Sequence, residues 1–155
     1  MKLFEKKKPE GYTIIVGCGR LGANLANTLS DDGHNVLIMD KDGHSFRRLS
    51  PSYGGLSVVG NGTDYDALLE AQIKNASVVV AVTNNDNTNI MVAQIARDIF
   101  HVESVIARLY DPERECVYRE FDIDTICPAV LSVKEVDKFL NKINVQPEIM
   151  KEIIA

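Results

Sequence analysis

The chain has few cysteines and fewer basic than acidic residues, and each shortage excludes some classes of protein. Three cysteines occur in 155 residues, Cys18, Cys116 and Cys127, far apart and without a C-x-x-C pair. This pattern favours neither a disulfide framework nor a zinc site and is typical of a reduced cytosolic protein. Lys and Arg number 17 against 22 Asp and Glu, a formal net charge of −5. The sequence lacks the basic surface of nucleic-acid binding, so we expect no nucleic-acid partner.

Long hydrophobic runs and catalytic motifs are also missing. No apolar run approaches the roughly 18 residues that a membrane-spanning helix needs. Residues 1–10 hold four Lys and two Glu but have neither the apolar stretch nor the cleavage site of a signal peptide, so we expect a charged leader there. The three histidines, His34, His44 and His101, share no motif with a nucleophile, and neither G-x-x-x-x-G-K-[ST] nor H-E-x-x-H occurs. The sequence predicts no catalytic residue and no metal site.

What the sequence does contain is a regular alternation of short apolar runs with helical patterns. β-Branched runs bounded by turn residues are typical of buried parallel strands, and apolar residues three or four apart indicate helices. The spacing predicts strands at 12–16, 35–39, 56–59, 77–82, 104–109 and 125–127, and helices at 20–30, 45–49, around 68–69, 87–100 and 112–120. Residues 11–130 are therefore predicted to form an α/β domain with a doubly wound, parallel six-stranded sheet in the order 3-2-1-4-5-6.

Two details of this prediction concern burial. The run 77–82 is the most apolar strand, so we expect it near the centre of the sheet. In the helix predicted at 87–100, the residues expected to face inward are Ile90, Val92, Ile95, Ala96 and Ile99.

A separate amphipathic segment occupies residues 131–155. Its apolar residues at helical spacing are Leu131, Val136, Phe139, Leu140 and Ile143, and they predict a helix that Pro147 breaks. This apolar segment follows a complete sheet, so we expect a second chain to cover it as a dimer contact. The alternative is that it packs back onto its own domain.

A glycine-rich turn lies between the first predicted strand and the first predicted helix. Gly17, Cys18, Gly19, Arg20, Leu21 and Gly22 form G-x-G-x-x-G, and Asp40 follows the next predicted strand. A strand before the motif, a helix after it and an acidic residue about 20 positions on indicate dinucleotide binding. In that interpretation Gly17 permits the tight turn, Gly19 lets the backbone approach a pyrophosphate, and Gly22 lets helix and strand pack closely. The alternative is a glycine-rich turn that holds no ligand.

Asp40 predicts which nucleotide binds. A carboxylate at this position accepts hydrogen bonds from ribose hydroxyls and repels a 2′-phosphate, which favours NAD or a plain adenine nucleotide over NADP. Lys41, Arg47 and Arg48 follow closely and keep NADP open as an alternative. A solvated helix face is the simpler interpretation of these three cations.

Polar residues also follow the third and fourth predicted strands. They are Asn61, Gly62 and Thr63 after the third, and Thr83 and Asn84 after the fourth. Ligands of open α/β sheets bind at the carboxyl ends of the strands, so we expect these residues to flank an adenosine. Turn formation and helix capping are the alternative, and for Asn85 and Asp86 they are the preferred interpretation.

Three residues invite individual predictions. Cys18 is interpreted as a small residue that fits the turn, in preference to a thiol activated by the helix N-terminus. Arg20 either reaches phosphates or is an ordinary exposed arginine of a first helical turn. Arg108 lies in an otherwise apolar strand, so we expect it to meet a carboxylate or an interface.

Taken together, these residues resemble the TrkA amino-terminal domain, also called the RCK or KTN domain, a cytosolic nucleotide-binding regulator of potassium channels and Trk/Ktr transporters. The resemblance spans about residues 11–143. It rests on 17–22, Asp40, 60–63 with Leu68, Thr83 with Asn89, 106–108 and Pro128. The G-[ND]-x-T-x-x-x-x-L stretch and the I-A-R segment are its more specific parts.

The resemblance implies a Rossmann-type domain that acts as a regulatory subunit, not an enzyme, and binds NAD(H) or an adenine nucleotide (ATP, ADP or AMP). It implies a homodimer, in some members within an octameric ring, on a membrane potassium transporter or channel at the cytoplasmic face. By position, Gly17, Gly19, Arg20 and Leu21 would face phosphates, Asp40 and Lys41 would hold the ribose, and 61–63 with Thr83 and Asn84 would flank the adenosine. Arg20 would also reach the partner's nucleotide, and the helix after Leu131 would be the crossover helix on the neighbouring subunit.

The sequence departs from the family pattern at three points. Asn61 stands where Asp is usual, which weakens the charge-based interpretation of the adenosine side. Ala129 follows Pro128 where Glu is common, which weakens the expectation of a divalent cation at the dimer seam. The family's carboxy-terminal regulatory domain is not within these residues, and we expect it as a separate chain. A small NAD-dependent oxidoreductase or cofactor-binding subunit, and a ligand-free scaffold, are the alternative hypotheses.

Overall fold

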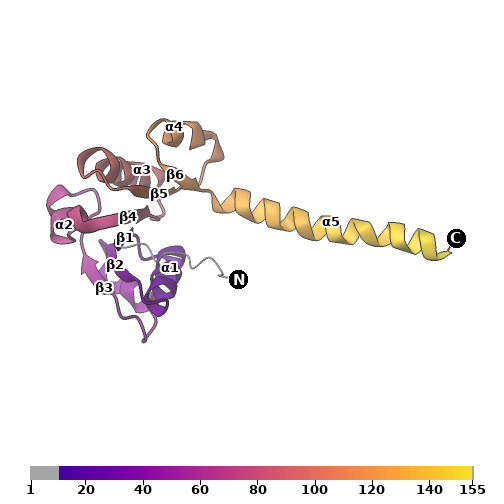
Figure 1. Ribbon diagram of the computed structural model, residues 1–155, viewed down its shortest axis with the longest axis horizontal. Coiled ribbons are helices and arrows are strands. Elements are labelled where there is room, and N and C mark those ends of the chain that lie inside the picture. The colour runs from indigo at the N-terminus through magenta and orange to yellow at the C-terminus, as the bar shows by residue number, and fades with distance from the viewer. Residues whose placement is uncertain (1–10, 155) are drawn as a thin grey trace, which may run out of the picture.

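The protein is built on one parallel sheet that helices cover on both faces (Figure 1). The computed structural model describes the backbone of residues 11–154 and the side chains of residues 11–143. The strands are β1 (Tyr12–Val16), β2 (Asn35–Asp40), β3 (Leu56–Val59), β4 (Ala76–Ala81), β5 (Ser104–Arg108) and β6 (Asp124–Ile126). They lie in the order β3-β2-β1-β4-β5-β6, and all are parallel. The predicted fold class and strand order are confirmed, with β4 inside the sheet as expected.

The helices connect successive strands. They are α1 (Arg20–Asp31), α2 (Tyr65–Glu70), α3 (Asp86–Gln94), α4 (Glu115–Glu120) and α5 (Pro128–Ile154), with 3₁₀ turns at Gly43–Arg48, Ile73–Asn75 and Pro112–Arg114. Asp64 caps α2, because its carboxylate accepts the backbone N–H groups of Asp66 and Ala67. Two predicted helices differ in type from the observed ones. The short helix predicted at 45–49 is a 3₁₀ turn, and the helix predicted at 112–120 begins with a 3₁₀ turn before α4.

The core has two halves because successive strand residues point to opposite faces of the sheet. Ile14 and Val79 belong to the half that includes residues of α2 and α3, and Ile15 and Val80 to the half that includes residues of α1. Leu21, Leu25 and Leu29, four residues apart on α1, pack against the second half. Burial on both faces explains why the strands read as nearly continuous apolar runs.

One inward-facing residue is predicted wrongly. The helix expected at 87–100 is α-helical only as far as Gln94, and Ile95–Ile99 form a π-helical turn. In this turn the N–H of Phe100 donates to the carbonyl of Ile95, five residues back (3.2 Å). The extra residue in the turn rotates the following side chains away from the helical register. Ile99 is consequently 54% exposed, whereas Val92 and Ala96 are buried as expected.

The last helix is longer than the sequence predicts. α5 continues through Pro147 to Ile154, so the expected break at that proline is wrong. A proline inside a helix removes one backbone hydrogen bond, and a long helix tolerates that loss without ending. Figure 1 shows α5 extending away from the sheet and its covering helices. Its apolar side chains lie in solvent, including Leu131, Val136 and Phe139 at 55%, 55% and 57% exposure, so packing back onto the same domain is not observed for the described side chains.

Candidate nucleotide-binding cleft

A cleft of about 490 Å³ opens at the carboxyl ends of the parallel strands. Residues at or just after the ends of five of the six strands line it, because parallel strands bring their carboxyl ends to one edge of the sheet. The lining residues are Val16, Gly17, Cys18, Gly19, Met39, Asp40, Lys41, Asp42, Ser45, Arg48, Gly60, Asn61, Gly62, Thr63, Val82, Thr83, Asn84, Asn85, Thr88 and Arg108. The cleft therefore collects most of the polar residues that the sequence places at strand ends.

The glycine-rich turn forms the floor of the cleft beside β1. Gly17 has φ +108, a conformation that L side chains rarely adopt. A Cβ on Gly22 would lie 1.8 Å from the carbonyl oxygen of Gly17, so α1 packs against the turn only because residue 22 has no side chain. A Cβ on Gly19 would meet no atom within 4 Å. The turn and packing tasks predicted for Gly17 and Gly22 are confirmed, and the space above Gly19 is open.

Asp40 joins β2 to the glycine-rich turn. Its Oδ2 accepts the backbone N–H of Cys18 at 2.8 Å, and its Oδ1 accepts the backbone N–H of Asp42 at 2.8 Å. Charge-assisted hydrogen bonds of this kind fix the carboxylate in orientation while leaving further lone pairs for a ligand. The acid predicted to hold a ribose is thus held beside the turn predicted to hold phosphates.

The loops after β3 and β4 are shaped by their own side chains. Asn61 accepts both the backbone N–H and the hydroxyl of Thr63 through Oδ1, at 3.0 and 2.8 Å. Asn85 caps α3 by accepting the backbone N–H of Thr88 at 2.9 Å, as preferred from the sequence. Asn61 and Asn85 also line the cleft, so local turn chemistry and the cleft surface use the same residues.

A buried asparagine organises the loop after β4. Asn89 has no exposed surface, and its Oδ1 accepts the backbone N–H of Thr83 at 2.9 Å and its hydroxyl at 2.6 Å. Its Nδ2 donates to the carbonyls of Thr83 and Arg108 at 3.0 and 3.1 Å. The amide oxygen thus accepts two hydrogen bonds and the amide nitrogen donates two, which fixes the ends of β4 and β5 relative to α3.

The first turn of α3 makes a second connection. The carboxylate of Asp86 accepts the backbone N–H groups of Tyr110 and Asp111 at 2.9 and 3.3 Å. The hydroxyl of Tyr118 in α4 donates to the carbonyl of Asp86 at 3.0 Å. Asp86 does not line the cleft, and its carboxylate holds the segment after β5, whereas the residue that caps α3 is Asn85.

Most, but not all, of the predicted site residues line the cleft. Those that do are Gly17, Cys18, Gly19, Asp40, Lys41, Asn61, Gly62, Thr63, Thr83 and Asn84. Arg20, Leu21 and Gly22 lie outside the lining: Arg20 is exposed, Leu21 packs against the core and Gly22 packs against the turn. The cleft adds Asp42, Ser45 and Thr88, which no motif marks, and Arg48, which was interpreted as part of a solvated face.

Of the two partners predicted for Arg108, a carboxylate and an interface, the structure tests only the first. None of its nitrogens lies within 4.0 Å of an acidic side chain in the described part of the chain, so the expected carboxylate partner is not found. The centre of its guanidinium instead lies 4.4 Å from the centroid of the Tyr110 ring. The side chain lines the cleft, because β5 ends at this edge of the sheet.

Cys18 has a buried thiol. Its side chain has no exposed surface, and Sγ donates to the carbonyl of Ser45 at 3.4 Å. Burial raises the pKa of this thiol, and the nearby Asp40 acts in the same direction. A thiol activated by the start of α1 would have a lowered pKa. The interpretation of Cys18 as a small residue that fits the turn is therefore favoured.

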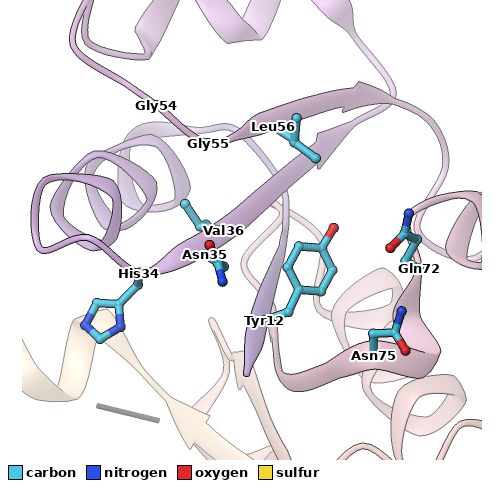
Figure 2. Close-up of a pocket in the computed structure, with 9 residues that line it drawn as sticks. All are labelled: Tyr12, His34, Asn35, Val36, Gly54, Gly55, Leu56, Gln72 and Asn75. Carbon is cyan, nitrogen blue, oxygen red and sulfur yellow. The ribbon is translucent and has the colours of Figure 1, made fainter. Parts of the chain in front are cut away.

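A smaller cavity of about 310 Å³ lies at the opposite, amino-terminal edge of the sheet (Figure 2). Tyr12, Gln72 and Asn75 contribute side chains to it, and the hydroxyl of Tyr12 already donates to the carbonyl of Ala71 at 3.0 Å. Gly54 and Gly55 line it, but the G-x-G-x-x-G motif does not, and no carboxylate is among its lining residues. Its position and composition make it a weaker candidate than the cleft at the carboxyl ends.

The described residues contain neither a membrane-spanning helix nor a metal-binding cluster. No helix there is long and apolar enough to cross a membrane. No three His, Cys, Asp or Glu side chains among them come close enough together to hold a metal ion.

The chain is similar in sequence to two potassium uptake proteins. The chain is 48% identical over 115 residues to the Trk system potassium uptake protein TrkA of Streptomyces coelicolor, covering 74% of this chain and 52% of that protein. It is 32% identical over 143 residues to the TrkA homolog of Methanothermobacter thermautotrophicus, covering 92% of this chain and 64% of the relative. The chain thus spans half to two-thirds of the length of these relatives.

A solved structure has the same fold. The TrkA-N domain of the inner membrane protein ybaL from Escherichia coli superposes with a TM-score of 0.76 at 17% identity, covering 84% of this chain and 96% of that one. The TrkA-N domain family itself matches residues 13–128, which include the glycine-rich turn, Asp40 and every strand residue except Tyr12. The chain belongs to the TrkA-N domain family.

Proposed function

We propose that the chain is the nucleotide-binding part of a regulator of Trk-type potassium uptake, and that NAD(H) or an adenine nucleotide binds in the cleft beside β1 and β2. The observation that carries the proposal is Asp40, whose carboxylate is held by the N–H of Cys18 at the edge of the glycine-rich turn. This arrangement puts a ribose acceptor next to backbone donors for phosphate. The residues proposed to contact the ligand are the predicted ones that line the cleft.

The comparisons support this choice of ligand. Proteins of the same fold have been solved with such molecules: the Kef C-terminal domain of Shewanella denitrificans with AMP (TM-score 0.67), and GsuK with ADP and with NAD (TM-scores 0.64 and 0.65). The sequence relatives are named as potassium uptake proteins. By analogy, binding in this chain biases one of two shapes of an assembly that acts on a membrane potassium transporter from its cytoplasmic side.

The chemistry of the cleft favours regulation over catalysis. No histidine lines it among the described residues, and the pKa of its thiol, Cys18, is raised by burial. Both oxygens of Asp40 already accept backbone N–H groups. An oxidoreductase, the second hypothesis, needs an acid or base beside the hydride-transfer site, and the uncharged Thr83, Asn84 and Asn85 on that side of the cleft offer none.

The first experiment is thermal unfolding with AMP, ADP, ATP, NAD and NADH. A ligand at about 100 times its Kd should add roughly 2.7 kcal/mol to the free energy of unfolding, a rise of about 5–10 °C in Tm. Asp40→Asn keeps the size of the side chain but removes its charge, so we expect affinity to fall about tenfold or more.

The matched control is Asp66→Asn, an exposed acid in the first turn of α2 that does not line the cleft. This variant should bind every nucleotide as the parent does. If no nucleotide raises the Tm of the parent protein at millimolar concentration, the proposal fails and the ligand-free scaffold is favoured. Turnover of NADH with a carbonyl substrate would favour the oxidoreductase.

We infer that a second copy of this chain covers α5. Its apolar residues are far more exposed than residues of the domain core, Phe139 at 57% and Ile143 at 61%. Phe139, Val136 and Ile143 lie three and four positions apart, so they form one stripe along the helix. An apolar stripe on a helix that extends from the sheet (Figure 1) suits the same stripe of a twofold-related copy.

Light scattering on a sizing column tests the pairing. We expect the parent protein to be a dimer and Phe139→Glu to shift it toward monomer, because a charge then lies in the apolar contact. Lys134→Glu, on the same helix but away from the stripe, is the control and should leave the dimer intact. A parent protein that is monomeric at tens of micromolar concentration excludes this contact.

A further inference from the structure

The two edge strands of the sheet differ in charge. β6 carries the exposed acid Asp124, whereas β3, with the sequence Leu-Ser-Val-Val, has neither a charged residue nor a proline. Natural edge strands are usually protected from pairing with another chain by charges, prolines, bulges or a covering segment. In the part of the chain that the structure describes, β3 pairs with β2 alone and without a bulge. Its outer edge is thus open to a further strand.

Two residues of β3 direct their backbone groups to this outer edge. The N–H of Gly60 donates to the last carbonyl of β2 at 3.0 Å, so the backbone of this residue faces β2. Alternate residues of a strand direct their backbone groups to the same side, and Leu56 and Val58 therefore face β2 as well. The N–H and C=O groups of Ser57 and Val59 consequently point away from the sheet.

The side chains of β3 are incompletely covered. Leu56 is 62% exposed and Val59 is 61% exposed. Val58 is half-buried and packs against the half of the core that includes residues of α2. Because successive side chains alternate, Leu56 lies on the same face of the sheet as Val58, and Val59 lies on the other face. A strand added here would bury apolar side chains on both faces and bond the free backbone groups.

We propose that a second copy of this chain occupies this edge, with the two β3 strands paired antiparallel about a twofold axis at Val58. Ser57 then lies opposite Val59 of the partner subunit, and the outward N–H and C=O groups of the two strands form four hydrogen bonds across the axis. Val58 lies opposite Val58 of the partner subunit. Leu56 lies opposite Gly60 of the partner subunit, which has no side chain to obstruct it.

Charge complementarity favours a second copy as the occupant. No charged residue occurs from Tyr53 to Thr63, so two copies of this segment pair without like charges opposite each other. A strand of another protein that carries Lys, Arg, Asp or Glu would find no opposite charge along this segment. The uncharged edge is therefore complementary to itself.

This contact is separate from the one proposed for α5. α5 begins at Pro128, directly after β6, and β6 and β3 are the opposite edges of the sheet (Figure 1). A contact between two four-residue strands is small, and small interfaces are weak. We therefore expect the β3 contact at high concentration, where it joins dimers formed through α5 into a larger assembly with two kinds of twofold contact.

Light scattering between about ten micromolar and about one millimolar protein tests the pairing. The mass of the parent protein should rise above that of a dimer as the concentration increases. Ser57→Lys and Val59→Glu each place a charge on the edge and should weaken this association about tenfold or more. The combined variant places each lysine opposite a glutamate of the partner subunit and should restore it. Asn24→Lys, exposed on α1, is the control and should behave as the parent.

Three outcomes overturn the proposal. The first is a parent mass that stays at or below that of a dimer at every concentration and is unchanged by Val59→Glu, which leaves the α5 contact untouched. The second is an equal effect of Val59→Glu and Asn24→Lys. The third is a combined variant that associates no better than Ser57→Lys, which excludes the antiparallel register. A parent that is monomeric when dilute, but pairs when concentrated unless Val59 is replaced, supports the β3 contact and excludes the α5 contact.

Discussion

Replacing Asn89 with alanine should lower the free energy of unfolding by about 3–4 kcal/mol, because the change removes four hydrogen bonds and leaves their partners buried. Those partners are the N–H, hydroxyl and carbonyl of Thr83 and the carbonyl of Arg108. Chemical denaturation monitored by circular dichroism measures the loss. Nucleotide affinity should fall as well, because the loop after β4 lines the cleft.

Asn87→Ala provides the matched control. Asn87 lies in the same helix but is exposed, and its Oδ1 accepts one bond from the guanidinium of Arg114 at 3.1 Å. Exposed contacts of this kind contribute little, so the change should stay within about 0.5 kcal/mol. Equal effects of Asn87→Ala and Asn89→Ala would contradict the organising role that we give to Asn89.

Gly22→Ala should destabilise the protein by about 3 kcal/mol or more, since the added methyl group overlaps backbone that cannot move independently. The new Cβ would lie 1.8 Å from the carbonyl oxygen of Gly17 and 3.3 Å from Cγ2 of Val82. Relief requires α1 to shift away from β1 and disturb the glycine-rich turn. The corresponding fall in Tm is about 6–12 °C for a domain of this size, and thermal unfolding measures it.

Gly19→Ala separates folding from binding. A Cβ on Gly19 meets nothing within 4 Å, and the residue has φ −80, which alanine adopts without strain. This variant should unfold at the parent temperature. It should nevertheless bind nucleotides more weakly, because the methyl group occupies the space above the turn where a pyrophosphate approaches. A lowered Tm of Gly19→Ala, or an unchanged Tm of Gly22→Ala, would contradict the roles in binding and packing that we give to these two glycines.

The fold could be predicted because apolar runs and turn residues mark its strands in the sequence. The run at β4 reads as a buried strand because both of its faces are covered, and turn residues bound each strand. The failures are local. The π-helical turn at Ile95–Ile99 depends on the packing around it and not on a residue type that favours it, so Ile99 was placed inward. At Pro147 the general tendency of proline to end a helix does not hold, because the long helix α5 continues through it.

The candidate site was predictable in part for a similar reason. Asp40 and the glycines occupy positions where local geometry allows few residue types, so the spacing identifies them. Arg48 and Thr88 line the cleft from a 3₁₀ turn and from the start of α3, and only the three-dimensional arrangement brings them there. The sequence marks Arg108 as a charge in an apolar strand, but the group that it faces depends on where β5 ends in the sheet.

The connections made by the start of α3 bear on how the two sides of the cleft are joined. Asp86 and Asn89, one turn apart, hold the loop after β4, the end of β5 and the loop that leads to α4. Asp40 lies on the other side of the cleft, with β2. Between the two sides stand β1 and β4, which pair from Tyr12 to Val16 of β1. A ligand that contacts both sides would therefore cross-link the two halves of the sheet at its carboxyl edge.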